Sequence, residues 1–144
     1  MQIRNLVVAG MVLVAVAAQS CKKDEVKNVN DALLSGNWHI HTATISGDSI
    51  PTTNAIGTFI DPCDADDLLN FESNGVLIQS EGPTSCNATD PAVDTTTWSL
   101  SADESLLTID QLPMTVVSHT NNSLVGTVTD LIPNTDLTIT LRND

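Results

Sequence analysis

The stretch "TTWSLSADESLLTIDQLPMTVVSHTNNSLVGTVTDLIPNTDLTITL", residues 96–141, decides the fold class. It contains five short runs rich in Thr, Val, Ile and Leu, each bounded by turn residues. These runs are 96–100, 106–110, 114–119, 124–129 and 137–141. Short segments of this composition, repeated about every ten residues, are typical of β-strands. Strands joined by short turns pair with their neighbours in the chain, so this half predicts an antiparallel meander.

The first half of the chain continues the same pattern. Similar runs occupy residues 38–45, 57–60, 67–71 and 75–80. Eight or nine strands in one small domain favour an all-β barrel of about eight strands, because closure removes exposed sheet edges. A two-sheet β-sandwich is the alternative. No helix is required, although residues 31–34 can form a short turn capped by Asp31.

The N-terminus has the features of an export signal. Residues 6–18 are thirteen apolar positions, and spanning a bilayer takes roughly 20. Arg4 precedes this run, and small or polar residues follow it, as in a secretory signal peptide. We therefore expect a signal peptide at 1–20, a flexible tether at 21–32 and one domain at 33–144.

The residues around the first cysteine resemble a bacterial lipobox. Ala18-Gln19-Ser20-Cys21 implies cleavage before Cys21 and acylation of its thiol by fatty acids such as palmitate. The sequence "CKKDE" that begins there resembles a signal that sends lipoproteins of one Gram-negative group to the cell surface. The resemblance implies an outer-membrane lipoprotein on the cell surface, and a periplasm-facing anchor is the alternative. Residues 22–30 have the composition of a solvated tether.

The charge balance excludes several partners. The chain has 18 acidic and 5 basic residues and a net charge of −13. Removal of residues 1–20 takes away Arg4 and no acid, which leaves 18 acidic and 4 basic residues, a charge of −14. Nucleic acids are excluded, because binding them needs clustered Lys and Arg. Attraction to anionic lipid headgroups is also excluded, so membrane association would come from the anchor.

The cysteine count fits this assignment. Three cysteines are an odd number for an exported chain. If Cys21 is acylated, Cys63 and Cys86 remain to form a disulfide in an oxidising compartment. A bridge that closes about two dozen residues stabilises a protein by roughly 3 kcal/mol.

Two groups of residues are candidate metal sites. His39 and His41 share one face of the strand at 38–45, and His119 would be a third ligand for zinc or copper. Alternation puts Trp38, Ile40, Thr42 and Thr44 on the other face. If Trp38 points inward, the two histidines point outward, and we predict no metal there.

Four aspartates near Cys63 suggest calcium, which binds six to eight oxygens. These are Asp61, Asp64, Asp66 and Asp67. Their spacing does not fit an EF-hand, and the alternative is a solvated loop, so the sequence leaves cation binding open. The sequence also lacks a Gly-x-Ser-x-Gly motif and any histidine in a catalytic context, so we predict a protein that is not an enzyme and has no cofactor.

Several motifs together resemble a known family. "LLSGNWHI", residues 33–40, resembles the opening of lipocalin-like domains, in which the tryptophan of Gly36-x-Trp38 packs across the closed end of the barrel. The ordered set of Cys63, "DDLLNFESNGV" (66–76), Cys86 and "TTTWSLSADESLLTI" (95–109) is similar to small lipocalin-like domains of secreted lipoproteins in the same Gram-negative group. The resemblance covers roughly residues 33–142.

This resemblance implies both a fold and a function. It implies a barrel lined by Leu, Val and Ile that binds a small apolar molecule, with Arg142 stacked on Trp38 in a cation–π contact. An eight-stranded barrel is either filled by side chains or holds one ligand. A cavity of about 300 Å³ or more would indicate ligand binding. A filled barrel would instead indicate an interaction or adhesion module of the cell envelope.

Overall fold

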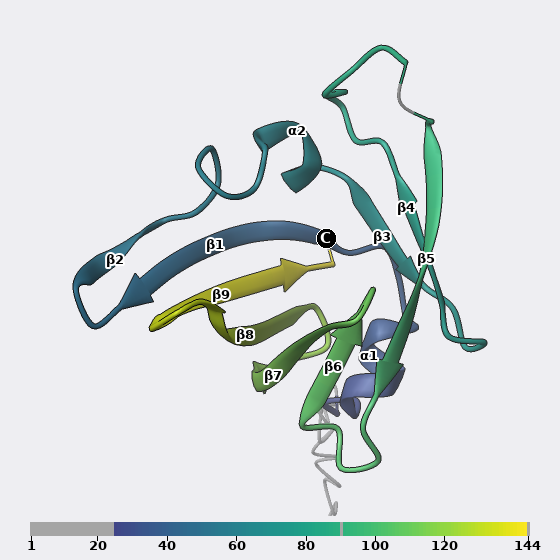
Figure 1. Cartoon of the computed structure of the whole chain (residues 1–144). Helices are drawn as coiled ribbons and strands as arrows, with labels where there is room; N and C mark the ends of the chain where they lie inside the picture. Colours follow the sequence, from purple (N-terminus) through teal and green to yellow (C-terminus); the bar gives the residue numbers. More distant parts are fainter. Residues whose placement is uncertain (1–24, 90, 144) are drawn as a thin grey trace, which may run out of the picture.

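The computed structural model describes residues 25–89 and 91–143, and it is an all-β antiparallel meander, which confirms the predicted fold class (Figure 1). The strands are β1 (His39–Gly47), β2 (Ile50–Asn54), β3 (Leu68–Phe71), β4 (Val76–Ser80), β5 (Val93–Leu100), β6 (Leu106–Ile109), β7 (Leu112–His119), β8 (Ser123–Ile132) and β9 (Thr135–Arg142). Two short helices accompany them, α1 (Val29–Leu33) and α2 (Pro62–Ala65). In the part of the chain that is described, neither helix has the length and apolarity needed to cross a membrane.

The nine strands form one curved sheet in the order β2-β1-β9-β8-β7-β6-β5-β4-β3. The end strand β3 meets the start of β1 through an isolated bridge, in which Trp38 and Leu69 exchange backbone hydrogen bonds of 2.8 and 2.6 Å. The nine strands agree with the expected eight or nine, whereas the expected closure into a barrel is incomplete. The reason is that the second half of β1 pairs with β2, so that edge of β1 is not available to β3.

The segment between β2 and β3 covers this opening. α2 lies between β1 and β3 in Figure 1, and it leads directly into β3. Ala55 and Ala65, both in this segment, are buried. The predicted strand at 57–60 is wrong: these residues form a loop that turns at Gly57, whose φ is +89°. The strand is β2 instead, where Pro51 is tolerated because the strand is at a sheet edge.

A β-bulge changes which residues of β1 face inward. The pairing of β1 with β9 skips one residue between Ile40 and Thr42. Residues after the bulge therefore reverse their facing, and Ala43 and Ile45 are buried while Thr42 is exposed. The prediction that Thr42 and Thr44 share the face of Trp38 is wrong for this reason.

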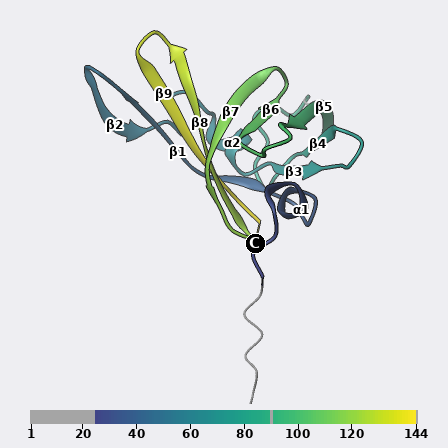
Figure 2. The same cartoon turned by 90° about the horizontal axis from the view of Figure 1, so that it is seen from below.

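One end of the sheet is filled by side chains. In Figure 2, β1, β7, β8 and β9 converge near the C-terminus, where α1 also lies, and spread apart toward the opposite end. Trp38 and Leu33 are fully buried at the converging end, and the Trp38 Nε1 donates a hydrogen bond to the Leu33 carbonyl (3.0 Å). Phe71 and Trp98 pack edge to face beside them, with ring centroids 5.2 Å apart. We call this the closed end.

Helix α1 is part of the domain. Val29 and Ala32 are buried in the core, so the expected flexible tether does not extend to residue 32. The helix is capped by Asn28, whose side chain accepts from the Asp31 N–H (2.7 Å), and not by Asp31 as predicted. The Glu104 carboxylate accepts from the N–H groups of Val29 (3.0 Å) and Asn30 (3.4 Å). A carboxylate at a helix N-terminus is stabilising.

The turn between β5 and β6 presents Glu104 to this helix. Its neighbour Asp103 accepts hydrogen bonds from the hydroxyls of Ser101 (2.6 Å) and Ser105 (2.9 Å). The bonds from Ser101 and then Ser105 lower the pKa of Asp103 below its ordinary value. Glu104 itself has a φ of 59° in the left-handed region. The local hydrogen bonds of Asp103 therefore hold the turn that carries Glu104.

Candidate ligand cavity

A cavity of about 320 Å³ lies inside the sheet beyond the closed end. Most of its lining is apolar: Ile40, Leu69, Leu77, Ile109, Leu112, Met114, Val128, Ile139 and Leu141. Four polar residues complete it: Gln79, Asp94, Thr96 and Asp110. The interior is thus filled at one end and hollow toward the other, and its hollow part reaches the size range of small-molecule sites.

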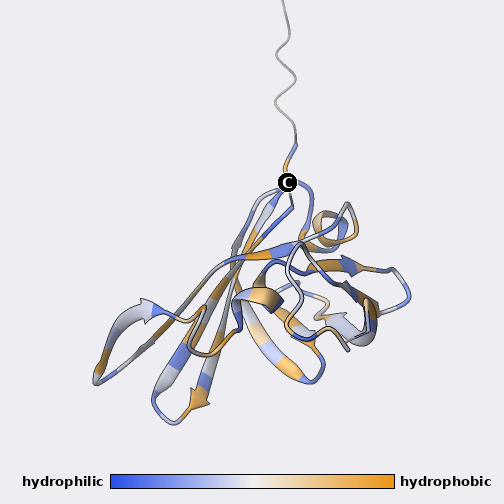
Figure 3. Ribbon diagram, turned by 90° about the horizontal axis from the view of Figure 1, so that it is seen from above, coloured by the Kyte–Doolittle hydropathy of each residue, from blue (hydrophilic) through white to orange (hydrophobic). Residues whose placement is uncertain are grey.

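Strand alternation and cross-strand pairing explain why these residues share one face. Figure 3 shows apolar and polar residues alternating along the long strands. On β5, the inward positions begin with Asp94 and Thr96 and continue to the buried Trp98. Gln79 pairs with Asp94 on one side and with Leu69 on the other, so these three form one row across β5, β4 and β3. Directly paired residues project from the same face of a sheet.

The mouth of the cavity is framed by polar residues. Asp94 lies near the start of β5, opposite Gln79. Asp110 lies in the two-residue turn between β6 and β7, in which it and Gln111 have φ of 44° and 68°. Asp94, Asp110 and Leu112 are exposed although they line the cavity, so the cavity reaches solvent here. The β5–β6 turn is at the opposite end of the same strands, so the mouth faces away from the closed end.

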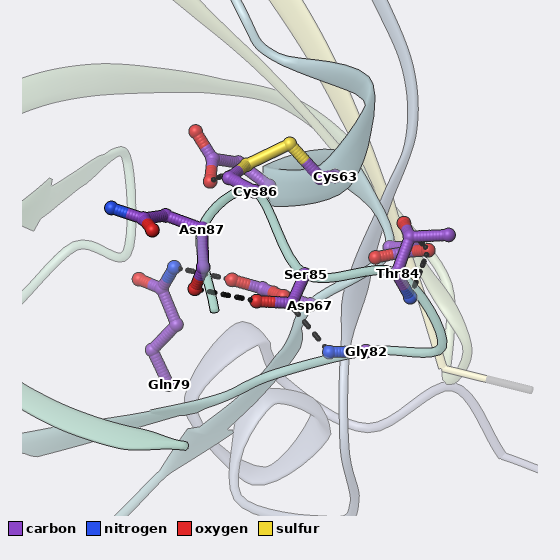
Figure 4. The surroundings of a disulfide bond; sticks show 10 residues. Cys63, Asp67, Gln79, Gly82, Thr84, Ser85, Cys86 and Asn87 are labelled. Carbon is purple, nitrogen blue, oxygen red and sulfur yellow. Dashed lines mark hydrogen bonds between the residues drawn. A yellow bond between two sulfur atoms is a disulfide. The ribbon is translucent and has the colours of Figure 1, made fainter. Parts of the chain in front are cut away.

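A buried carboxylate fixes Gln79 on the cavity wall. Asp67 is only 3% exposed, and it accepts hydrogen bonds from the Gln79 Nε2 (2.7 Å) and the Gly82 N–H (2.9 Å) (Figure 4). Buried polar groups need such partners, and these two bonds provide them. A Cβ at position 82 would collide with the Asp66 backbone, so this close approach requires glycine. A solvated loop is the alternative that the sequence allows for the four aspartates, and the predicted strand 67–71 begins at Asp67; the burial of Asp67 does not fit a solvated position.

The predicted disulfide between Cys63 and Cys86 is present (Figure 4). Their Cα atoms are 5.3 Å apart, and the two residues are 23 positions apart in sequence. Cys63 belongs to α2, and Cys86 lies in the loop between β4 and β5. Gln79 and Asp94 stand at the two ends of this loop. The disulfide therefore ties the loop beside the cavity mouth to the segment that covers the sheet opening.

Replacing both cysteines, Cys63→Ser/Cys86→Ser, is expected to lower the free energy of unfolding by about 3 kcal/mol, because the unfolded chain gains the freedom of the opened loop. Urea denaturation followed by tryptophan fluorescence measures the change. Wild-type protein in a reducing agent is the matched control and should unfold at the same urea concentration as the variant. An unchanged midpoint in both samples would contradict the stabilising role of the bridge.

Within the described part of the chain, the three histidines do not come together as a group of ligands. The rings of His39 and His41 lie edge to face with centroids 6.3 Å apart, and His41 is exposed. The His119 Nε2 lies 3.1 Å from the Lys27 carbonyl oxygen. Among the described residues, one group places three ligand atoms close together, namely Cys63, Asp64 and Cys86. Its two sulfurs are bonded to each other, so neither is a thiolate ligand.

The four aspartates near Cys63 take different roles. Asp61 is exposed at the start of α2, whereas Asp67 is buried against Gln79. Asp66 accepts hydrogen bonds from the backbone and the hydroxyl of Thr84. These contacts fasten the 82–86 loop and do not bring the four carboxylates to one point within the described residues.

The residues of the expected barrel-end signature are at the closed end, but Arg142 does not stack on Trp38. Arg142 pairs with His39 across β9 and β1, so it projects from the outer face, and it is exposed. Trp38 points to the inner face and is fully buried. Gly36 lies against Asn143, whose amide would collide with a Cβ at position 36. Cys21 lies outside the described residues.

Comparisons with known proteins give distant structural similarities. No protein-family model and no curated protein matches the sequence. A bovine odorant-binding protein from nasal mucosa is similar at 15% identity, with a TM-score of 0.46 over 84% of this chain and 77% of that one. The bovine odorant-binding protein in complex with its natural ligand gives 15% identity and a TM-score of 0.44, over 85% and 77%. Its complex with a selenium-containing odorant gives 16% and 0.43 over the same shares.

Proposed function

We propose that this protein is an exported, lipid-anchored protein of the cell envelope whose domain binds a small apolar molecule. The observation that carries the proposal is the cavity of about 320 Å³ with nine apolar residues in its lining. Apolar walls with a few placed polar groups are characteristic of small-molecule sites. The meander, with Trp38 buried at one end, also fits the lipocalin-like fold that the sequence motifs implied.

The cavity favours ligand binding over the alternative of a purely adhesive module. Well-packed interiors contain few voids larger than a water molecule, and burying apolar side chains against one another would stabilise the domain. Here Leu77 and Met114 line an open space, although both are buried from bulk solvent. A bound apolar molecule would supply the contacts that these side chains lack.

The position of the chain entry supports the proposed anchor. The Asn121 side chain donates to the Glu25 carbonyl (3.1 Å) and accepts from the Lys27 N–H (2.7 Å). Asn121 belongs to the turn between β7 and β8, at the closed end, so the chain enters the domain there. Cys21 is four residues before Glu25, so an acyl group on Cys21 would hold the closed end toward the outer membrane. The cavity mouth would then face away from the membrane, in keeping with display at the cell surface.

The ligand function is tested by filling the cavity. Thr96 is a small cavity-lining residue on β5, so Thr96→Trp places an indole in the open space and is expected to weaken binding at least about tenfold. Binding is measured by the fluorescence of the neutral probe N-phenylnaphthylamine. Thr97→Trp is the matched control, because Thr97 is the next residue on the same strand and faces outward. No probe binding to the wild type, or equal binding by both variants, would overturn the proposal.

A further inference from the structure

We infer that the cavity selects apolar molecules that carry a positively charged amine at one end. This inference rests on the proposed function and specifies the class of ligand for the same site. The cavity is divided by polarity, with Ile40, Leu141 and Met114 in its apolar walls and Asp94 and Asp110 at its exposed mouth. A matching ligand is an amphiphile with its chain inside and its polar end at the mouth.

The charged groups at the mouth, Asp94 and Asp110, are hydrogen-bond acceptors. The Asp67 carboxylate can only accept, and it takes the Nε2 of Gln79. This bond fixes the Gln79 amide, which keeps its carbonyl oxygen as an acceptor and its second amide hydrogen as a donor. One oxygen of Asp94 accepts from the Thr95 N–H (2.7 Å), which leaves the second oxygen for a ligand. A primary ammonium group has three donors and no acceptor, so it complements this arrangement.

The charge of the site also favours a cation. Asp94 and Asp110 line the cavity, and Asp67 lies directly behind Gln79. The basic side chains of the described residues are Lys27 and Arg142. Both lie at the closed end, Lys27 against Asn121 and Arg142 at the end of β9 paired with Ser123. An anionic headgroup at the mouth would therefore meet carboxylates without a compensating cation.

Three ligands with the same apolar chain separate charge from apolarity: decylamine, decanol and decanoate. Displacement of N-phenylnaphthylamine at neutral pH and low salt measures their affinities. We expect decylamine to bind about tenfold more tightly than decanol, and decanoate to bind more weakly than either, with salt reducing the difference. Equal binding of amine and alcohol, or the tightest binding by decanoate, would overturn the inference while leaving the proposed function intact. Failure of all three and of the probe would overturn both.

The variant Asp94→Asn/Asp110→Asn tests which charges are responsible. It should bind decanol as the wild type does and lose the preference for decylamine. The matched control, Asp48→Asn/Asp61→Asn, removes the same charge from two exposed aspartates that are not in the cavity lining, and should keep the preference. If the control loses the preference as fully as the cavity variant, overall charge explains it and the inference fails.

Discussion

Replacing Trp38 with alanine is expected to lower the free energy of unfolding by about 4 kcal/mol, which is within the range for removing a buried aromatic side chain. Trp38 is fully buried and ties three parts of the domain together. Its indole packs at the closed end, its Nε1 bonds the Leu33 carbonyl of α1, and its backbone forms the bridge to Leu69 of β3. The substitution leaves a void and a buried carbonyl without its donor, so two penalties add. Urea denaturation monitored by circular dichroism measures the loss.

Trp38→Phe reduces the penalty from the void and keeps the penalty from the unpaired carbonyl. Phenylalanine keeps an aromatic ring but has no N–H, so a loss of about 1 to 2 kcal/mol is expected from the smaller volume and the lost hydrogen bond. Leu106→Ala is the control for an exposed apolar residue, because Leu106 is 39% exposed on β6. An alanine variant of Trp38 that is no less stable than Leu106→Ala would show that the closed end does not depend on the tryptophan.

The meander was predictable because two independent signals agree in the second half of the chain. Alternating Thr, Val, Ile and Leu mark the strands, and turn residues separate them at nearly regular intervals. The strands β5 to β9 all overlap their predicted ranges for this reason. β2 was not predicted because it lacks the first of these signals. All its residues are exposed, and hydrophobic alternation does not reveal a fully exposed edge strand.

The bulge in β1 was not predictable from alternation. The run from Trp38 to Ile45 fits period two without interruption, and a single unpaired residue reverses the facing of everything after it. The pairing with β9 determines which residues of β1 face inward, because Leu141 and Ile139 must both face inward opposite Ile40 and Ala43. Such a constraint between distant segments does not appear in a local pattern.

The sequence could not decide whether the interior of the sheet is filled or contains a cavity. Leu, Ile and Val at inward positions have the same pattern whether the interior is full or hollow, because the volume depends on how far the strands spread. The residues at the mouth carry a signal in the sequence. Asp94 and Thr96 are four and two positions before the inward Trp98, which already places a carboxylate on the inner face of β5. The burial of Asp67 had no such signal, because it depends on Gln79 and Gly82 across the hairpin.

Replacing Cys21 with serine is expected to move the protein almost completely from the membrane fraction to the soluble fraction. The test chain is exported behind a conventional cleavable signal peptide in place of residues 1–20, so that no apolar leader is retained. Each buried CH₂ of an acyl chain contributes about 0.8 kcal/mol, so two or three chains hold a protein lastingly and none leaves only the surface of the domain. With 18 acidic and 4 basic residues, that surface has no attraction for anionic lipids.

Fractionation after a high-salt wash, together with the mass of the mature chain, decides this prediction. The matched control is Cys63→Ser/Cys86→Ser, which also removes cysteines but keeps Cys21 and should stay with the membranes. Sedimentation of the Cys21→Ser protein with the washed membranes would rule out the lipid anchor. The released protein should still bind N-phenylnaphthylamine as tightly as the anchored one, since the chain enters at Asn121 and the mouth at Asp110 is at the other end of the sheet. The anchor would then determine where the cavity is displayed and leave its affinity unchanged.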